Sequence, residues 1–322
     1  SWALVRVAQD GSGDFTSIQA ALDTAAAGEE VRVIDRGTYN EYLYARNRLL
    51  TSVPAGAIVT APVTLDAEGV TTVSGFTLSP SGLLDFYIVN QTATVALQNI
   101  TVTSGAGVLI EKARTVTMTD CSIQNVAGHG VNVVGDGTDN LALTLTRCEL
   151  SHCTVFGMAL QRAATVTFND CLLTQNSQAG LIITDTGARQ TGKPITFDAT
   201  TVTQNTNGGV LVQRACDLIV RNGSSFANCP VRAINIDGAT VDGGSLTVSD
   251  SSFTGNADGA ILLVRNWNCT ITGSSFTGNR YALFRTAEYA PQYATNISIS
   301  QSNFSANRSE ERRVGKECRS RW

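Results

Sequence analysis

Eight charged residues recur after short apolar runs in the second and last thirds of this chain, and the first seven alternate in sign. In order they are Lys112, Asp136, Arg162, Asp185, Arg214, Asp237, Arg265 and Arg285. Basic side chains at every second place could follow the carboxylates of an acidic polymer, because guanidinium and ammonium groups form charge-assisted hydrogen bonds with carboxylates. A surface ladder of opposite charges could instead pair with itself, at about 0 to 1 kcal/mol per pair. We take the first seven as predicted substrate-binding residues and keep both interpretations open.

The same residues also allow a catalytic interpretation. A polysaccharide lyase needs an Arg or Lys to remove the proton beside a uronate carboxylate, and it needs acids, often with Ca²⁺, to neutralise that carboxylate. Arg162, between Asp136 and Asp185, fits this requirement best, and Lys112 lies beside Glu111. No coil between positions 108 and 284 departs from the others, as a unique active site would. The sequence therefore favours a polysaccharide-binding or structural surface role. A lyase or glycoside hydrolase acting on acidic polysaccharide is the alternative, and Ca²⁺ is a cofactor only under the lyase form of it.

Histidines and cysteines add little further chemistry. His129 lies in Gly128-His129-Gly130 at an ordinary repeat position, and His152 takes a turn position. No Cys-x-x-Cys or His-rich spacing predicts a structural zinc site. Three cysteines share one repeat position, and we expect them to stack inside the fold: Cys121, Cys148 and Cys171. Strands about 4.8 Å apart would place neighbouring thiols within reach of a disulfide.

These residues are positioned by a repeat of coils. The place of Cys121 recurs at Cys148, Cys171, Thr200, Ser224, Ser251, Ser274 and Ser302, so coils of 23 to 29 residues alternate between short and long. The longer coils carry the loops that contain Asp136, Asp185 and Asp237. A fixed period of this size indicates a solenoid, in which each unit buries its apolar face against the next.

The pattern inside each coil indicates strands and turns. Runs such as Val116-Thr-Met-Thr and Leu143-Thr-Leu-Thr alternate apolar and polar residues, as half-buried strands do. Two positions after the Cys121 place we expect an inward stack, made of Ile123, Leu150, Leu173, Val202, Phe226, Phe253, Phe276 and Phe304. An Asn follows in most coils and predicts a left-handed turn. Three short strands per coil make the fold all-β, a single-stranded right-handed parallel β-helix.

Composition and the two ends set the limits of the domain. Charged residues are 16% of the 322, the net charge is −4, and no apolar run reaches the ~20 residues of a membrane span. Residues 308–322 break the repeat and read like a translated sequencing adapter, so we expect them to be a non-native tail. Without them, 17 basic and 24 acidic residues remain, a balance of −7 that gives no support for nucleic-acid binding. We expect residues 1–53 to form a cap and residues 54–307 the coils of one monomeric, exported protein, located outside the cell or on its surface.

The cap also carries a family resemblance. Residues 16–27 have the spacing of an amphipathic helix that ends at Gly28. The segment Val7-Ala-Gln-Asp-Gly-Ser-Gly-Asp-Phe-Thr-Ser-Ile-Gln-Ala-Ala21, followed by Gly37-Thr-Tyr-Asn-Glu41, resembles the N-terminal segment of pectin methylesterases in the pectin-lyase-like β-helix superfamily. The resemblance implies the same fold with a capping helix. The catalytic motifs are not matched, since only Gly82-Leu-Leu-Asp85-Phe86 echoes the esterase motif and the Asp pair of polygalacturonases is absent.

Overall fold

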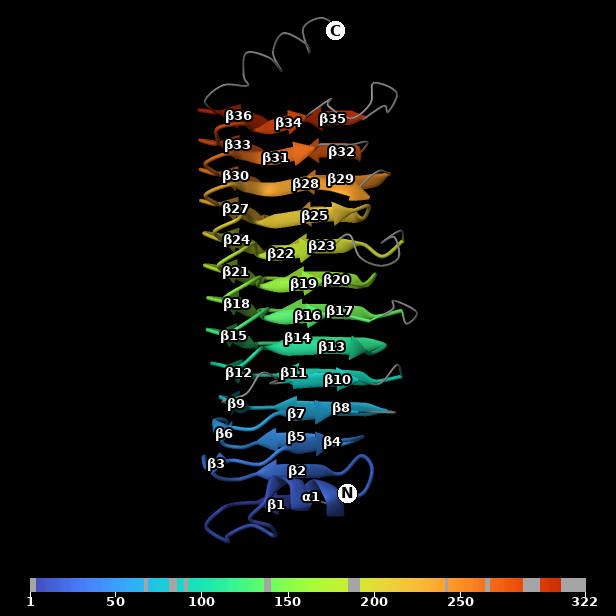
Figure 1. Cartoon of the computed structure of the whole chain (residues 1–322), viewed down its shortest axis with the longest axis vertical. Coiled ribbons are helices and arrows are strands. Elements are labelled where there is room, and N and C mark those ends of the chain that lie inside the picture. Colours follow the sequence, from blue (N-terminus) through green and yellow to red (C-terminus); the bar gives the residue numbers. More distant parts are fainter. Residues whose placement is uncertain are drawn as a thin grey trace, which may run out of the picture.

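The chain winds into one straight solenoid with three long parallel sheets, as Figure 1 shows. The structure is a computed structural model that describes residues 4–66, 69–80, 86–89, 92–135, 140–184, 192–240, 243–263, 267–285 and 296–307. Each sheet takes one strand from each successive coil, and neighbouring strands pair parallel and in register. The prediction of an all-β, single-stranded parallel β-helix is confirmed.

Sheet A has 13 strands. They are β1 (Leu4–Val7), β2 (Glu30–Val33), β5 (Leu49–Ser52), β8 (Val70–Ser74), β11 (Thr94–Gln98), β14 (Thr115–Thr119), β17 (Ala142–Thr146), β20 (Thr165–Asn169), β23 (Ile195–Asp198), β26 (Asp217–Arg221), β29 (Gly244–Ser249), β32 (Trp267–Thr272) and β35 (Ile297–Ser300).

Sheet B has 12 strands, which follow those of sheet A along the chain. They are β3 (Thr38–Tyr39), β6 (Ala57–Val59), β9 (Phe76–Leu78), β12 (Thr101–Val102), β15 (Ser122–Gln124), β18 (Glu149–Ser151), β21 (Leu172–Thr174), β24 (Thr201–Thr203), β27 (Ser225–Ala227), β30 (Ser252–Thr254), β33 (Ser275–Thr277) and β36 (Asn303–Ser305).

Sheet C has 11 strands and completes each coil. They are β4 (Leu43–Ala45), β7 (Val63–Leu65), β10 (Phe86–Val89), β13 (Val108–Lys112), β16 (Val131–Val133), β19 (Met158–Leu160), β22 (Leu181–Ile183), β25 (Val210–Arg214), β28 (Arg232–Thr240), β31 (Gly259–Leu263) and β34 (Leu283–Arg285).

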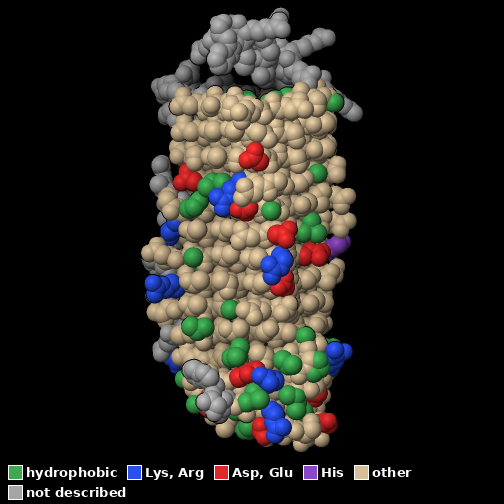
Figure 2. Space-filling view, turned by 180° about the vertical axis from the view of Figure 1, so that it is seen from behind, with side chains coloured by type: hydrophobic (Ala, Val, Ile, Leu, Met, Phe, Trp, Pro, Cys, Tyr) green, Lys and Arg blue, Asp and Glu red, His purple; other side chains and the backbone are tan. Residues whose placement is uncertain are grey.

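The core is a set of columns of like side chains that run along the solenoid axis. The predicted inward stack is confirmed, because Phe253 is fully buried with its ring 5.2 Å from that of Phe226 and 4.8 Å from that of Phe276. Phe304 continues the stack 4.8 Å from Phe276 and is partly buried. Side chains between the inward positions face outward. Seen from behind, the surface is mostly uncharged polar side chains and backbone with few charged groups (Figure 2).

The turn after sheet B differs by one residue from the sequence prediction. Asn125, His152 and Asn228 do take the left-handed backbone, with φ between 53° and 58°. Other coils place Gln175, Gln204, Gly255, Gly278 or Ala306 in that conformation. The Asn that follows each of those five residues is buried instead.

These buried asparagines form a ladder of hydrogen bonds between coils. The Asn256 backbone N–H and Nδ2 donate to Asn279 Oδ1 at 3.0 and 2.8 Å, and Asn279 donates in the same way to Asn307 Oδ1. Asn279 Nδ2 also reaches the Phe253 carbonyl at 2.9 Å. A buried amide that satisfies neighbouring main-chain groups stabilises the corner, because unsatisfied buried polar groups are costly.

A short helix lies at the N-terminal end of the solenoid (Figure 1). Helix α1 (Ile18–Thr24) falls within the expected residues 16–27, and the Glu41 carboxylate accepts hydrogen bonds from the Ile18 and Gln19 backbone N–H groups at 2.9 and 3.0 Å. Strands β2 to β5 already pair within the three sheets, so the coils begin inside the predicted cap. Residues 308–322 lie outside the described residues. Among the residues that are described, no helix has the length and hydropathy to span a membrane.

Candidate functional site

The predicted substrate-binding residues lie at the C-terminal ends of sheet C strands. Lys112 ends β13, Arg214 ends β25, Asp237 lies within β28, and Arg162 follows β19 by two residues. Arg285 ends β34, and Asp136, Asp185 and Arg265 lie outside the described residues. The shared repeat position therefore places the described members in one row along the C-terminal ends of the sheet C strands. Their role in substrate binding stays a prediction.

The side chains at this edge differ in exposure. Arg162 and Arg214 are only 1% and 2% exposed, whereas Asp237 is exposed and Lys112 is half-buried. Arg162 packs over the preceding coil, where its Cδ would lie 3.6 Å from a Cβ placed on Gly135. Burial lowers the pKa of the Arg214 guanidinium. The two buried arginines are therefore not part of a solvent-facing charge ladder, because each belongs to the packed structure of its coil.

Sequence reasoning missed a group of tyrosines on the outer face of the same sheet. Tyr44 on β4, Thr64 on β7, Tyr87 on β10 and Leu109 on β13 pair in register and form one outward column. Tyr42 immediately precedes β4. The side chains of Tyr42 and Tyr44 are 53% and 40% exposed, and Tyr87 is partly exposed. Their rings therefore line the surface near the N-terminal end of the solenoid.

Each tyrosine hydroxyl bonds to a side chain on the next coil, two positions further along the strand. Tyr44 donates to Asp66 Oδ2, Tyr87 donates to Glu111 Oε2, and the Tyr42 hydroxyl pairs with Thr64 Oγ1. Such diagonal contacts are within the reach of aromatic side chains. Hydrogen bonding to the carboxylates raises the pKa of Tyr44 and of Tyr87, so both phenols stay protonated at neutral pH. The bonds also fix the direction of each ring.

We call this group the tyrosine strip and define it as Tyr42, Tyr44, Asp66, Tyr87, Glu111 and Lys112. Lys112 is the Cα partner of Val89, which lies two positions after Tyr87, so the strip includes a basic residue on the strand next to its last tyrosine. Among the described residues, the Lys112 ammonium forms no ion pair. The strip thus combines aromatic faces, two carboxylates and one available cation.

The polar face of sheet C is interrupted a few coils further on. Gln161 Nε2 donates to Asn132 Oδ1 at 3.0 Å, which continues the polar surface across β16 and β19. The outward column then turns apolar and buried, with Ala159 at 1% and Ile182 at 6% exposure. A ligand on this face would therefore meet a break in the polar surface at β19 and β22, before Asn235 on β28 makes the column polar again.

Several other histidine and aromatic side chains have structural surroundings. His152 is a left-handed turn residue, as expected, and His129 stacks on Phe156 with ring centroids 5.5 Å apart. Burial lowers the pKa of His129. Trp267 is fully buried in the core. Asp85 lies outside the described residues, and no group of three potential metal ligands occurs within the part of the chain that the structure describes.

Comparison with known proteins identifies the family. Residues 61–193 and 186–315 match the family model described as the right handed beta helix region. The chain belongs to this family. The two matched segments together cover most of the coils. No curated protein matches the chain.

Several solved structures share the fold of this β-helix. The A-module of mannuronan C-5 epimerase AlgE6 of Azotobacter vinelandii is 15% identical, with a TM-score of 0.60 over 89% of this chain and 94% of that one. PfbA, a surface adhesin of Streptococcus pneumoniae, is 11% identical, with a TM-score of 0.52 over 89% and 88%. Pectate lyase Pel9A is 13% identical, with a TM-score of 0.50 over 94% and 80%. At these identities the likeness shows the fold alone.

Proposed function

We propose that this β-helix binds a polysaccharide along the outer face of sheet C, and that the tyrosine strip is the main contact surface. The observation that carries the proposal is the row of partly exposed tyrosines whose hydroxyls are fixed by the neighbouring coil. Several proteins of the same fold are named for action on polysaccharides, including a mannuronan epimerase and a pectate lyase. That likeness supports the ligand class.

The strip suits sugar rings for two physical reasons. Aromatic side chains supply a large apolar face at a small cost in conformational freedom, and sugars present apolar C–H faces to such rings. The carboxylate of Glu111 retains lone pairs that can accept hydrogen bonds from sugar hydroxyls. A rigid sheet holds both kinds of group in place before the ligand arrives, which reduces the entropic cost of binding.

The spacing suits a polymer that runs along the solenoid axis. Tyr44 and Tyr87 occupy the same column two strands apart, which corresponds to about 10 Å. Two successive rings can therefore meet different sugar units of one chain. Lys112 lies on the strand next to the second tyrosine and can bind a carboxylate, so we propose an acidic polysaccharide as the preferred ligand.

The test compares ring removal with hydroxyl removal. Tyr44→Ala and Tyr87→Ala should each weaken binding of polygalacturonate or alginate by roughly tenfold, about 1.4 kcal/mol, because each deletes a stacking face. Tyr44→Phe keeps the ring and should retain most of the affinity. Tyr281→Ala, on a residue far along the chain, serves as the control. Isothermal titration calorimetry measures all four variants, and equal affinity of the parent and both alanine variants would contradict the proposal.

A catalytic role is the second candidate, and one observation favours it. The Tyr87–Glu111 hydrogen bond involves the residue before Lys112, so a phenol, a carboxylate and an amine come from neighbouring positions of β10 and β13. Under this alternative, Lys112 replaces the buried Arg162 as the best candidate base. Lysis of polyuronates would release unsaturated sugars that absorb ultraviolet light, and Lys112→Ala should abolish that signal. No release from pectate or alginate would leave binding as the function.

We further propose that the protein acts outside the cytoplasm. Proteins of the same fold include the periplasmic alginate epimerase AlgG and the surface adhesin PfbA. A polysaccharide ligand is consistent with such a location.

A further inference from the structure

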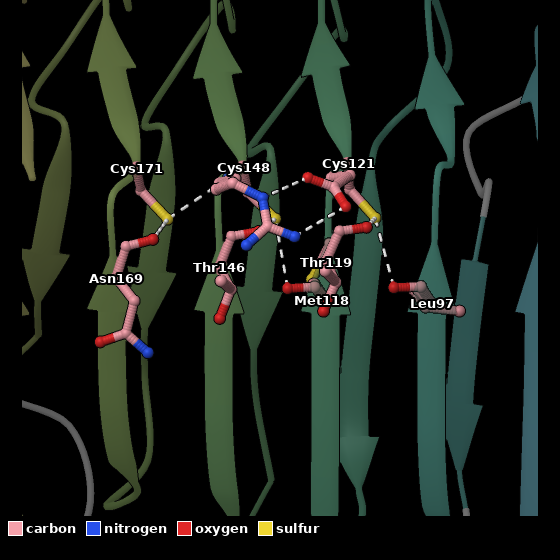
Figure 3. A network of polar contacts seen from close by, with 10 residues as sticks. Leu97, Met118, Thr119, Cys121, Thr146, Cys148, Asn169 and Cys171 are labelled. Atoms are coloured by element: carbon pink, nitrogen blue, oxygen red, sulfur yellow. Dashed lines mark hydrogen bonds and ion pairs between the residues drawn. The ribbon is translucent and has the colours of Figure 1, made fainter.

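Three buried cysteines form a column at the corner between sheets A and B. Cys121 separates β14 from β15, and Cys148 and Cys171 hold the same place on the next two coils. They are between 2% and 4% exposed, and all three are free thiols. Figure 3 shows their sulfur atoms in a row across successive coils. We call these three residues the thiol ladder.

Hydrogen bonds join the thiols of the ladder to backbone groups of their own and neighbouring coils. The Cys148 backbone N–H donates to Cys171 Sγ at 3.4 Å, and the Cys148 thiol donates to the Met118 and Thr146 carbonyls at 3.3 and 3.4 Å. The flanking strands pair in register on both sides of the corner. Neighbouring Cα atoms are therefore about one strand spacing apart, roughly 4.8 Å, which falls within the span of a disulfide.

Sulfur is not needed for the structural role of this position. In later coils Thr200, Ser224, Ser251 and Ser274 fill the same place. The hydroxyls of Thr200, Ser224 and Ser274 accept the backbone N–H of the preceding coil, from Cys171, Thr200 and Ser251, at 3.3, 3.1 and 3.2 Å. A hydroxyl therefore accepts the backbone N–H at this corner as well as a thiol does. Three consecutive thiols supply an additional chemistry, which is oxidation.

We propose that Cys148 is an oxidative cross-linking site, which forms an inter-coil disulfide with either Cys121 or Cys171 when the protein folds in an oxidising medium. The oxidant is a small-molecule or protein disulfide. The Cys148 thiolate attacks one sulfur of that disulfide and releases one thiol. A neighbouring ladder thiolate then displaces the second thiol, so two cysteines lose two electrons and two protons while the oxidant disulfide is reduced to two thiols.

The centre of the ladder is the place where this reaction should start. Thiol donors on both sides lower the pKa of Cys148, while hydrogen bonding to Cys148 and burial raise the pKa of Cys121 and of Cys171. The thiolate is the reactive form of cysteine. Cys121 and Cys171 are two coils apart, too far to join each other, so only one bond can form and it must include Cys148.

The experiment refolds the full chain from denaturant with glutathione disulfide, alkylates the remaining thiols and maps the peptides by mass spectrometry. Wild type should lose two alkylatable thiols and yield a cross-linked peptide that contains Cys148, and oxidation should raise its melting temperature. Cys121→Ser and Cys171→Ser should each still form one bond. Cys148→Ser should form none, although Ser is tolerated at this position in Ser251 and Ser274.

Two further variants make the result decisive. The double variant Cys121→Ser/Cys171→Ser removes both partners and should also stay reduced. Cys153→Ser replaces a buried cysteine outside the ladder and should cross-link like wild type. Wild type that keeps all thiols alkylatable after refolding, or Cys148→Ser that still loses ladder thiols, would overturn the proposal. Neither result depends on polysaccharide binding, so the two proposals fail separately.

Discussion

At the scale of single residues, a repeat position determines where a residue lies on its coil. It does not determine whether neighbouring coils and loops bury the side chain. Arg162 and Arg214 were predicted from the repeat to lie on the same edge as Lys112, and they do. The sequence did not reveal that both guanidinium groups are buried, because exposure depends on the loops and on neighbouring coils such as that of Gly135. The alternation of basic and acidic residues was visible in the sequence. Which of the basic side chains are buried was not.

This difference predicts unequal effects of two arginine substitutions. Arg162→Ala should lower the free energy of unfolding by about 2 to 5 kcal/mol, because it leaves a cavity where a large side chain is packed. Arg147→Ala is the matched control, since its side chain is 52% exposed and pairs with Asp120 at 2.7 Å. That change should cost less than about 1 kcal/mol. Urea unfolding measures both, and equal small losses would show that the burial of Arg162 has no energetic consequence.

At the scale of elements, the strands were predictable and the turns only in part. Alternating runs such as Val116-Thr-Met-Thr appear as β14 with the expected inward side chains, because a strand face needs only a period of two. The Asn positions were recognised, yet in several coils the left-handed residue precedes the Asn. This one-residue difference depends on whether the Asn side-chain amide fits inside the turn after sheet B. The local sequence does not specify that fit.

The two kinds of asparagine should respond differently to substitution. Asn279→Ala removes the acceptor of the Asn256 backbone N–H and side chain and should cost about 1 to 3 kcal/mol for each buried group left unsatisfied. Asn228→Gly changes an exposed left-handed residue with φ of 53° to one that adopts this backbone freely. It should be neutral or slightly stabilising. Thermal unfolding followed by circular dichroism compares the two, and similar melting temperatures would refute the ladder as a stabilising element.

At the scale of the whole molecule, the solenoid could be predicted and the candidate site could not. The recurrence of one place from Cys121 to Ser302 was enough to indicate stacked coils and a single elongated domain. The tyrosine strip draws Tyr44, Asp66, Tyr87 and Glu111 from four successive coils that share no recognisable repeat motif. Only the strand register brings them together. The alternation in Tyr42-Leu43-Tyr44 was the one local signal that two rings share an outer face.

The central claim is that a polysaccharide lies on the tyrosine strip, and hydroxyl-radical footprinting of the tyrosine rings tests it most directly. Tyr42 and Tyr44 are 53% and 40% exposed, so both should react readily in the free protein. Saturating polygalacturonate or alginate should slow oxidation of Tyr42, Tyr44 and Tyr87 several-fold and leave the rate at Tyr281 unchanged. Unchanged rates at all three strip tyrosines, under conditions where calorimetry shows the polymer bound, would contradict the account.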